Sequence, residues 1–109
     1  MLVGVIIRIE VKYTAIPDKY SLQQAYPNPF NPHTTITYSL PQVDHVRLIV
    51  YDINGNLVRK LVNGVENPGI KNVVWDSKNE FGEDVPSGMY IYTFQAANFK
   101  RSKKILLIR

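Results

Sequence analysis

The residue types that most often carry catalysis or bind metals are scarce in this sequence of 109 residues. It has no cysteine, which excludes disulfides, thiol nucleophiles and thiolate-held zinc or iron–sulfur clusters. Its two histidines are poorly placed for a catalytic triad, because His33 follows a proline-rich stretch and His45 falls in an expected turn. The sequence also lacks GxSxG, HExxH, P-loop and GxGxxG motifs. We therefore predict that the protein is not an enzyme and needs no cofactor.

Oxygen-bearing side chains gather in one place, the polar loop 76–84. Calcium prefers such ligands, but their spacing does not fit the EF-hand pattern and Lys78 adds a positive charge. The favoured interpretation is a solvated hairpin loop in which Asp76 accepts backbone N–H bonds and caps the turn. Whether the loop binds a cation stays open, and no metal ligand is predicted.

The positive charge of the chain is concentrated near its C-terminal end. Thirteen basic and nine acidic side chains give a net charge of +4, and no acidic residue follows Asp84. A basic strand of this kind can contact an acidic partner, a membrane surface or nucleic acid. It can equally be a sheet edge whose lysines prevent aggregation, and this interpretation is favoured. The basic residues concerned are Lys100, Arg101, Lys103, Lys104 and Arg109.

Nucleic acid is not an expected partner, and no membrane span is predicted. Tyr90, Tyr92 and Phe94 lie beside the basic residues and could stack on bases, but aromatic residues at every second position are more typical of the inner face of a sandwich. The apolar run 1–7 is too short to span a bilayer, which needs about 20 residues. It also lacks the flanking features of a signal peptide.

The spacing of prolines, glycines and β-branched residues predicts an all-β protein. Turn signals every 8–12 residues favour an antiparallel β-sandwich or small barrel of about seven strands. Asn54-Gly55 predicts a two-residue type I′ hairpin turn, and a loop is expected between Asn63-Gly64 and Pro68-Gly69. The expected strands are 5–13, 34–40, 46–52, 57–62, 70–75, 89–97 and 101–108.

The division of the chain follows from the same pattern. Residues 1–21 are expected to form an N-terminal strand and linker, as in a remnant of a preceding domain, and residues 22–109 the main domain. Trp75 is the best core candidate, and Phe30 and Tyr26 are expected to anchor the proline-rich segment to the core.

Several motifs, taken in order, resemble a known family. The first is the run Tyr26-Pro27-Asn28-Pro29-Phe30-Asn31-Pro32, which is followed by the strand 34–40 and Pro41. Three further motifs come next: Asp52 with Gly55, the pair Trp75-Asp76, and the run Val85-Pro86-Ser87-Gly88-Met89-Tyr90. Lys103-Lys104-Ile105 and the apolar residues up to Arg109 complete the set. Together they resemble the type IX secretion system C-terminal sorting domain, in the branch related to the Ig-like domain of the flagellar hook-capping protein.

The resemblance implies an Ig-like β-sandwich without catalytic activity. It implies a signal that directs an upstream cargo from the periplasm across the outer membrane of a Gram-negative bacterium, for surface attachment or release. The partners would be the secretion machinery, a shuttle protein and a sortase-like enzyme. Two departures are Ser77, where the family commonly has glycine, and Asn79-Glu80, where an acidic residue is often found within the next loop.

We expect the recognition element at the last strand, where strand addition and charge complementarity could act together. Deleting residues 103–109 should then trap a fused reporter in the periplasm. A sorting domain must end its polypeptide, which fits the end of this sequence at Arg109. The expected recognition residues are Gly88, Tyr90, Lys103, Lys104, Ile105, Leu107 and Arg109.

Two other functions stay open on the sequence alone. One is an Ig-like module that acts as a spacer or a passive part of an assembly. The other is a carbohydrate-binding sandwich, which would expose Trp75 or the tyrosines in a planar row. The cargo, its cleavage and the oligomeric state are not predicted.

Overall fold

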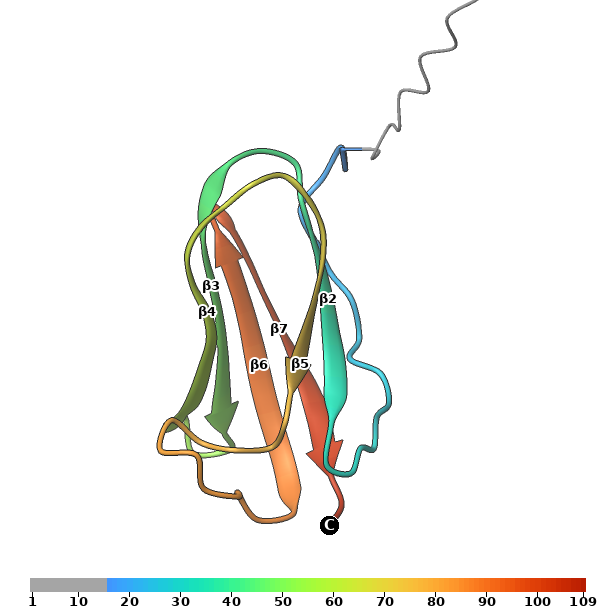
Figure 1. Cartoon of the computed structure of the whole chain (residues 1–109), viewed down its shortest axis with the longest axis vertical. Coiled ribbons are helices and arrows are strands. Elements are labelled where there is room, and N and C mark those ends of the chain that lie inside the picture. Colours follow the sequence, from blue (N-terminus) through green and yellow to red (C-terminus); the bar gives the residue numbers. More distant parts are fainter. Residues whose placement is uncertain (1–15) are drawn as a thin grey trace, which may run out of the picture.

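The computed structural model describes residues 16–109, which form two facing antiparallel sheets with no helix in this range (Figure 1). One sheet has three strands in the order β1-β2-β5, and the other has four in the order β4-β3-β6-β7. The all-β Ig-like sandwich is thus confirmed. The expected strand 5–13 lies outside the described residues. The strands are β1 (Ser21–Leu22), β2 (Thr34–Leu40), β3 (Asp44–Asp52), β4 (Leu57–Glu66), β5 (Gly69–Trp75), β6 (Gly88–Ala96) and β7 (Phe99–Leu107).

The core lies between the sheets and is lined mainly by alternate residues of β2, β3 and β6, whereas β4 contributes only Val58 as a buried residue. Trp75 is fully buried, as predicted, and its ring packs against those of Phe30 and Tyr90 at centroid distances of 5.4 and 5.3 Å. A second aromatic pair, Tyr38 and Phe94, stacks at 4.6 Å. Because the aromatic side chains of β6 point into this core, they are not available to stack on bases or sugars.

The hairpin at Asn54-Gly55 exists, but its predicted geometry is wrong. The Asp52 N–H donates to the Asn56 carbonyl at 3.0 Å, so the loop has three residues rather than two. Only Gly55 has a positive φ, of 83°, whereas a type I′ turn needs two such residues. The Asp52 carboxylate accepts the N–H groups of Asn54 and Asn56, both at 2.9 Å, and this stabilises the longer loop.

The prediction of a loop that begins at Asn63-Gly64 is also wrong. β4 continues through Asn63-Gly64 to Glu66, because β3 begins earlier than predicted and supplies partners for these residues. Gly64 lies opposite Val46 in this ladder. A glycine in a strand costs conformational entropy, but the surrounding pairs outweigh it.

The segment between β1 and β2 joins the two sheets. Its first part pairs with β2, and Phe30 then pairs in parallel with Leu107 at the end of β7. Phe30 is 2% exposed and anchors the segment as predicted, whereas Tyr26 is 81% exposed and does not. The short strand β1 was not predicted, since two residues carry no visible alternation.

Candidate recognition site at the C-terminal strand

The last strand, β7, forms one edge of the four-stranded sheet and alternates between buried and solvent-facing residues. Ile105 and Leu107 are 1% and 0% exposed and belong to the core. Lys104 is exposed on the outer face, and Lys103 is partly buried at the opening between the sheets. Of the predicted recognition residues, the lysines are therefore accessible, whereas the two apolar side chains are not.

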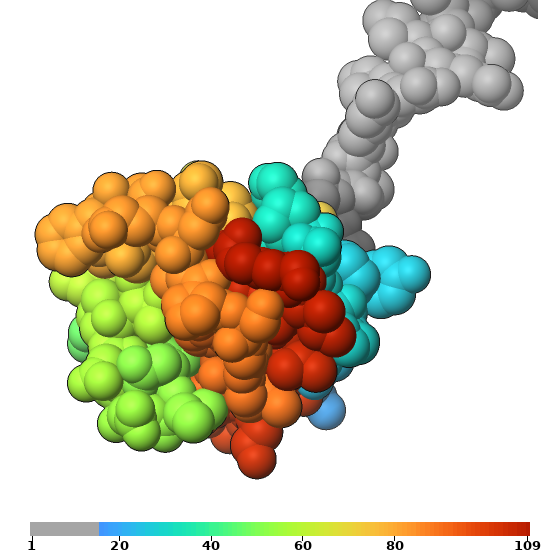
Figure 2. Space-filling view, turned by 90° about the horizontal axis from the view of Figure 1, so that it is seen from below, coloured from blue at the N-terminus to red at the C-terminus, as the bar shows by residue number. Residues whose placement is uncertain are grey.

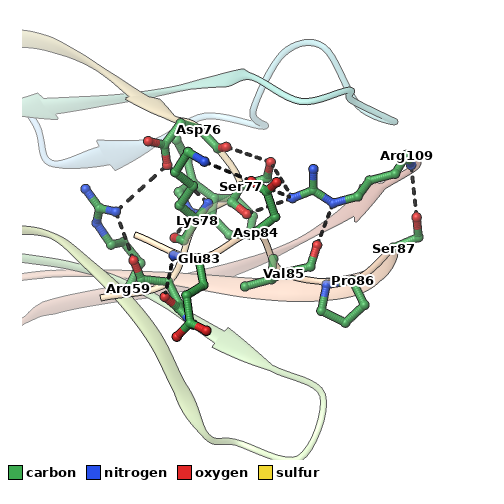
Figure 3. A network of polar contacts seen from close by, with 12 residues as sticks. Arg59, Asp76, Ser77, Lys78, Glu83, Asp84, Val85, Pro86, Ser87 and Arg109 are labelled. Atoms are coloured by element: carbon green, nitrogen blue, oxygen red, sulfur yellow. Dashed lines mark hydrogen bonds and ion pairs between the residues drawn. The ribbon is translucent and has the colours of Figure 1, made fainter. Parts of the chain in front are cut away.

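Arg109 does not project freely into solvent but binds the loop that follows Trp75 (Figure 3). Its guanidinium group donates to the carbonyl oxygens of Val85 at 2.6 Å and Ser77 at 2.9 Å, and to the Ser77 hydroxyl at 3.0 Å. Its backbone N–H donates to the Ser87 hydroxyl at 2.9 Å. The C-terminal end is thereby fixed against the loop 76–87. Figure 2 shows this end of the sandwich, with the C-terminal residues between that loop and the segment before β2.

The loop 76–87 receives Arg109 because its backbone turns sharply at Ser77. Ser77 is fully buried and has a φ of +58°, a conformation that glycine adopts more easily than serine. This conformation gives a physical reason for the glycine that is common at this position in the sorting domains that the sequence resembles. Asp76 accepts the Lys78 N–H at 3.1 Å, as predicted for a turn cap, and the Trp75 indole N–H donates to the Lys78 carbonyl at 3.0 Å.

Asp84 supplies the negative charge of this site. Its carboxylate lies 2.9 Å from Lys78 Nζ and 3.7 Å from the Arg109 guanidinium. The hydrogen bond and charge of Lys78, with the charge of Arg109, hold the pKa of Asp84 below its ordinary value. The carboxylate is turned toward side-chain cations of this chain, and among residues 16–109 no group of three metal-ligating acidic, histidine or cysteine side chains occurs.

The outer edge of β7 differs from the expected row of unpaired backbone groups. The Phe30 N–H donates to the Leu106 carbonyl, and the Ile108 N–H donates to the Phe30 carbonyl, both at 3.0 Å. The Leu106 N–H donates to the Asn28 side chain at 3.0 Å. Because alternate residues of an edge strand present their backbone groups outward, the outward groups from Leu106 onward are already occupied by the segment 28–30.

The accessible part of this edge lies further back, around Ser102. No hydrogen bond from residues 16–109 reaches the outward backbone groups of Ser102. A groove of about 310 Å³ opens here between β1 and β7, and its walls include Leu22, Phe99 and Lys103. Arg101 lies over the Phe99 ring at 4.5 Å. On either side of Ser102, the Lys100 and Lys104 carbonyls accept hydrogen bonds from the side chains of Arg101 and Gln24, both at 2.9 Å. The groove therefore combines an apolar wall, cationic side chains and the unpaired backbone of Ser102.

Gly88 and Tyr90 contribute to the shape of the site rather than to its surface. Gly88 has a φ of +154°, and no heavy atom outside its chain neighbours lies within 4 Å of the place where a Cβ would stand. The backbone conformation, not a close approach, is therefore what requires glycine here. Tyr90 is 5% exposed and donates its hydroxyl to the Pro86 carbonyl at 2.6 Å, while burial raises its pKa.

Sequence reasoning missed the residues that hold Arg109 and β7 in place. Ser77 and Ser87 contact Arg109, and Asn28 contacts Leu106. Serine and asparagine are frequent in loops for many reasons, so their presence gave no signal. The one usable signal was the serine at the place of the family glycine, which marks a special backbone position.

Comparisons with known proteins agree with the fold. The family model described as the FlgD Ig-like domain matches residues 32–100. A search of curated protein sequences gives no significant match. No helix in residues 16–109 has the length and apolar character needed to cross a membrane.

Three solved structures are similar. PorZ, described as an essential bacterial surface component of the type IX secretion system of Porphyromonas gingivalis, has a TM-score of 0.58 and 20% identity over 79% of this chain and 11% of its own. Dimeric latent PorU of the same organism has a TM-score of 0.65 and 19% identity over 86% of this chain and 10% of its own. FlgD of P. aeruginosa has a TM-score of 0.53 and 24% identity over 68% of this chain and 57% of its own.

The chain thus spans about a tenth of PorZ and PorU and just over half of FlgD. At these identities the likeness shows the fold alone. The family match ends at residue 100 and so does not include most of β7 or Arg109.

Proposed function

The chain belongs to the family of FlgD Ig-like domains, and from this premise we propose that it is a non-catalytic C-terminal sorting domain for type IX secretion. It directs a cargo protein attached upstream from the periplasm across the outer membrane, for attachment to the cell surface or release. Its partners are the secretion machinery, a shuttle protein and a sortase-like enzyme. The motifs from Tyr26 to Arg109 support this role, as does the fold shared with a surface component of that system.

One structural observation carries the proposal. β7 is held at its end by Arg109 and Phe30. The Gln24 side chain donates to the Lys104 carbonyl, while the backbone of Ser102 stays accessible next to Lys103. A partner strand can pair with the backbone at Ser102, and its acidic side chains can contact the two lysines. Rigid presentation lowers the entropy cost of binding, because the edge needs no ordering when the partner arrives.

The groove beside Ser102 lies close to the point where a cargo enters, because Tyr20 and Ser21 line it. The described chain begins at the end of the sandwich opposite to its C-terminus (Figure 1). A cargo that enters at the first end leaves the loop 76–87 and the end of β7 exposed. The Ig-like architecture itself is compatible with a spacer role, so the test must separate recognition from mere folding.

The deletion of residues 103–109 would be a poor test, because it removes Ile105 and Leu107 from the core. We suggest instead the double substitution Lys103→Glu and Lys104→Glu in the full chain, fused behind an exported reporter in a type IX-secreting bacterium. The reporter should accumulate in the periplasm. The matched control, Lys60→Glu with Lys71→Glu, makes the same change of charge on β4 and β5 and should be displayed normally.

Thermal unfolding of the purified variants shows whether each is folded. A folded Lys103→Glu/Lys104→Glu variant that still reaches the surface as efficiently as the control would refute recognition through β7. In that case the spacer role would be the better explanation of the same fold.

A further inference from the structure

We propose that the outer face of the four-stranded sheet carries a binding site for a phosphate group, centred on Arg47, Gln95 and Lys100. This site is independent of the sorting role and lies on another surface from the groove beside β1. The three residues form one row across adjacent strands, since Arg47 lies opposite Gln95 and Gln95 lies opposite Lys100. All three side chains are exposed.

A hollow of about 160 Å³ lies over this row. Ile49 forms part of it and is only 4% exposed although it is on the solvent side of the sheet. The neighbouring row supplies Thr93, whose hydroxyl lies 2.7 Å from that of Ser102 on β7. Tyr51 completes the wall. The face therefore has a depression with an apolar patch and polar walls, rather than a flat row of lysines.

The donors of this row are not used within the described residues. No hydrogen bond or ion pair of residues 16–109 involves the side-chain nitrogen atoms of Arg47, Gln95 or Lys100. An arginine offers five N–H donors, a lysine three and an amide two. A phosphate group placed over Gln95 can therefore accept bonds from all three side chains, with the arginine in a bidentate arrangement.

Electrostatics favours an anion with two negative charges. By strand register, the residues of β3, β6 and β7 on this face include Arg47, Lys100 and Lys104 and no acidic residue. The Glu80 carboxylate accepts the backbone N–H of Lys60 on β4. Arg47 and Lys100 stand on either side of Gln95, on the two strands that flank β6, and a dianion bound between them attracts both cations. A phosphate monoester carries about −1.5 to −2 charges at pH 7.

The test is an amide NMR titration of the full chain with glucose 6-phosphate, inorganic phosphate and glucose at fixed ionic strength. Saturating shifts confined to the amides around Arg47, Thr93, Gln95 and Lys100 are expected with glucose 6-phosphate and none with glucose. If inorganic phosphate binds as tightly as glucose 6-phosphate, the phosphate group alone is recognised. If inorganic phosphate binds more weakly, the sugar contributes to binding. Either outcome supports the site.

Substitutions make the assignment specific. Arg47→Ala and Lys100→Ala should each weaken binding about tenfold, as expected for loss of a charged hydrogen-bond donor. Lys71→Ala on β5, in the other sheet, should leave the affinity for glucose 6-phosphate unchanged. Because Arg47 and Lys100 are exposed, both variants should stay folded, and their amide spectra report this directly. Shifts spread over all basic residues, or affinity unchanged in Arg47→Ala, would overturn the proposal.

Discussion

Arg109 shows how a single side chain can define the end of this domain. Its planar guanidinium group donates to the carbonyl groups of Val85 and Ser77, which lie 24 and 32 residues earlier in the chain. A lysine, whose ammonium group is a point charge on a flexible side chain, could not hold the carbonyl oxygens of Ser77 and Val85 in the same way. The residue therefore has a structural role in addition to any contact with a partner.

We expect Arg109→Ala to lower the free energy of unfolding by about 1–2 kcal/mol, because charged hydrogen bonds are lost at a site that is only partly shielded from water. Arg109→Lys should recover little of this loss, since it keeps the charge but not the two-pronged geometry. Urea denaturation measures both. Full stability of Arg109→Ala would show that the contacts with the loop contribute nothing.

Asp84 should make stability depend on pH. Its pKa is lower in the folded protein than in the unfolded chain, because Lys78 and Arg109 stabilise the carboxylate. The stabilisation by Asp84 is therefore complete above the pKa of the unfolded chain, which is about 4. It is lost as the pH falls through the lower pKa that Asp84 has in the folded protein. Asp52, whose pKa is lowered by backbone hydrogen bonds in the hairpin loop, titrates in the same direction.

The corresponding measurement is the urea midpoint at neutral pH and at a pH below both the folded and the unfolded pKa of Asp84. Asp84→Asn should start from a lower midpoint and lose less of it on acidification than the unsubstituted protein. An identical loss in both proteins would mean that the pair with Lys78 does not survive in solution.

Among the elements, β7 has to serve both the core and the surface. Ile105 and Leu107 fill the core, whereas Lys100, Ser102 and Lys104 face solvent. The position of each long strand beyond residue 33 was predictable from the sequence, because β-branched and aromatic residues alternate there and prolines interrupt the pattern. Thr34–Leu40 was predicted to the residue. The errors fall where a partner strand decides the outcome, as at Asn63-Gly64, or where a side chain reshapes a turn, as Asp52 does.

The turn between β6 and β7 offers a stabilising substitution. Ala97 is exposed and has a φ of +50°, which is unfavourable for a residue with a Cβ. Ala97→Gly relieves this strain, which costs about 1–2 kcal/mol, but increases the freedom of the unfolded chain. We expect a net gain of about 0.5–1 kcal/mol, seen as a rise in melting temperature. A fall would show that the left-handed conformation at Ala97 is not adopted.

Leu107→Ala separates the folding role of β7 from its proposed recognition role. Leu107 is fully buried, so its truncation should cost about 2–5 kcal/mol through lost contacts and a cavity. The change in denaturation midpoint measures this cost. Lys104→Ala on the exposed face should alter stability by less than about 0.5 kcal/mol. If the two substitutions had equal effects, the inward and outward assignment of β7 would be wrong.

At the scale of the whole molecule, the candidate site joins segments that are far apart in the sequence. Asn28 and Phe30 precede β2, Ser77 and Val85 lie in a mid-chain loop, and Arg109 follows β7. The motifs indicated that each segment matters, but no local pattern shows that the first covers the edge of the last. The sequence therefore predicts the sandwich and the basic strand, while the accessible stretch around Ser102 follows only from the packing of the segments.

We propose that this domain alone suffices to send an attached protein across the outer membrane. The direct measurement attaches the full chain to the C-terminus of a periplasmic fluorescent reporter, in a bacterium with an active type IX system, and determines the fraction of reporter outside the outer membrane. The fusion should reach the surface or the medium, while the reporter without the domain should stay in the periplasm. A folded fusion that remains in the periplasm would contradict the proposal.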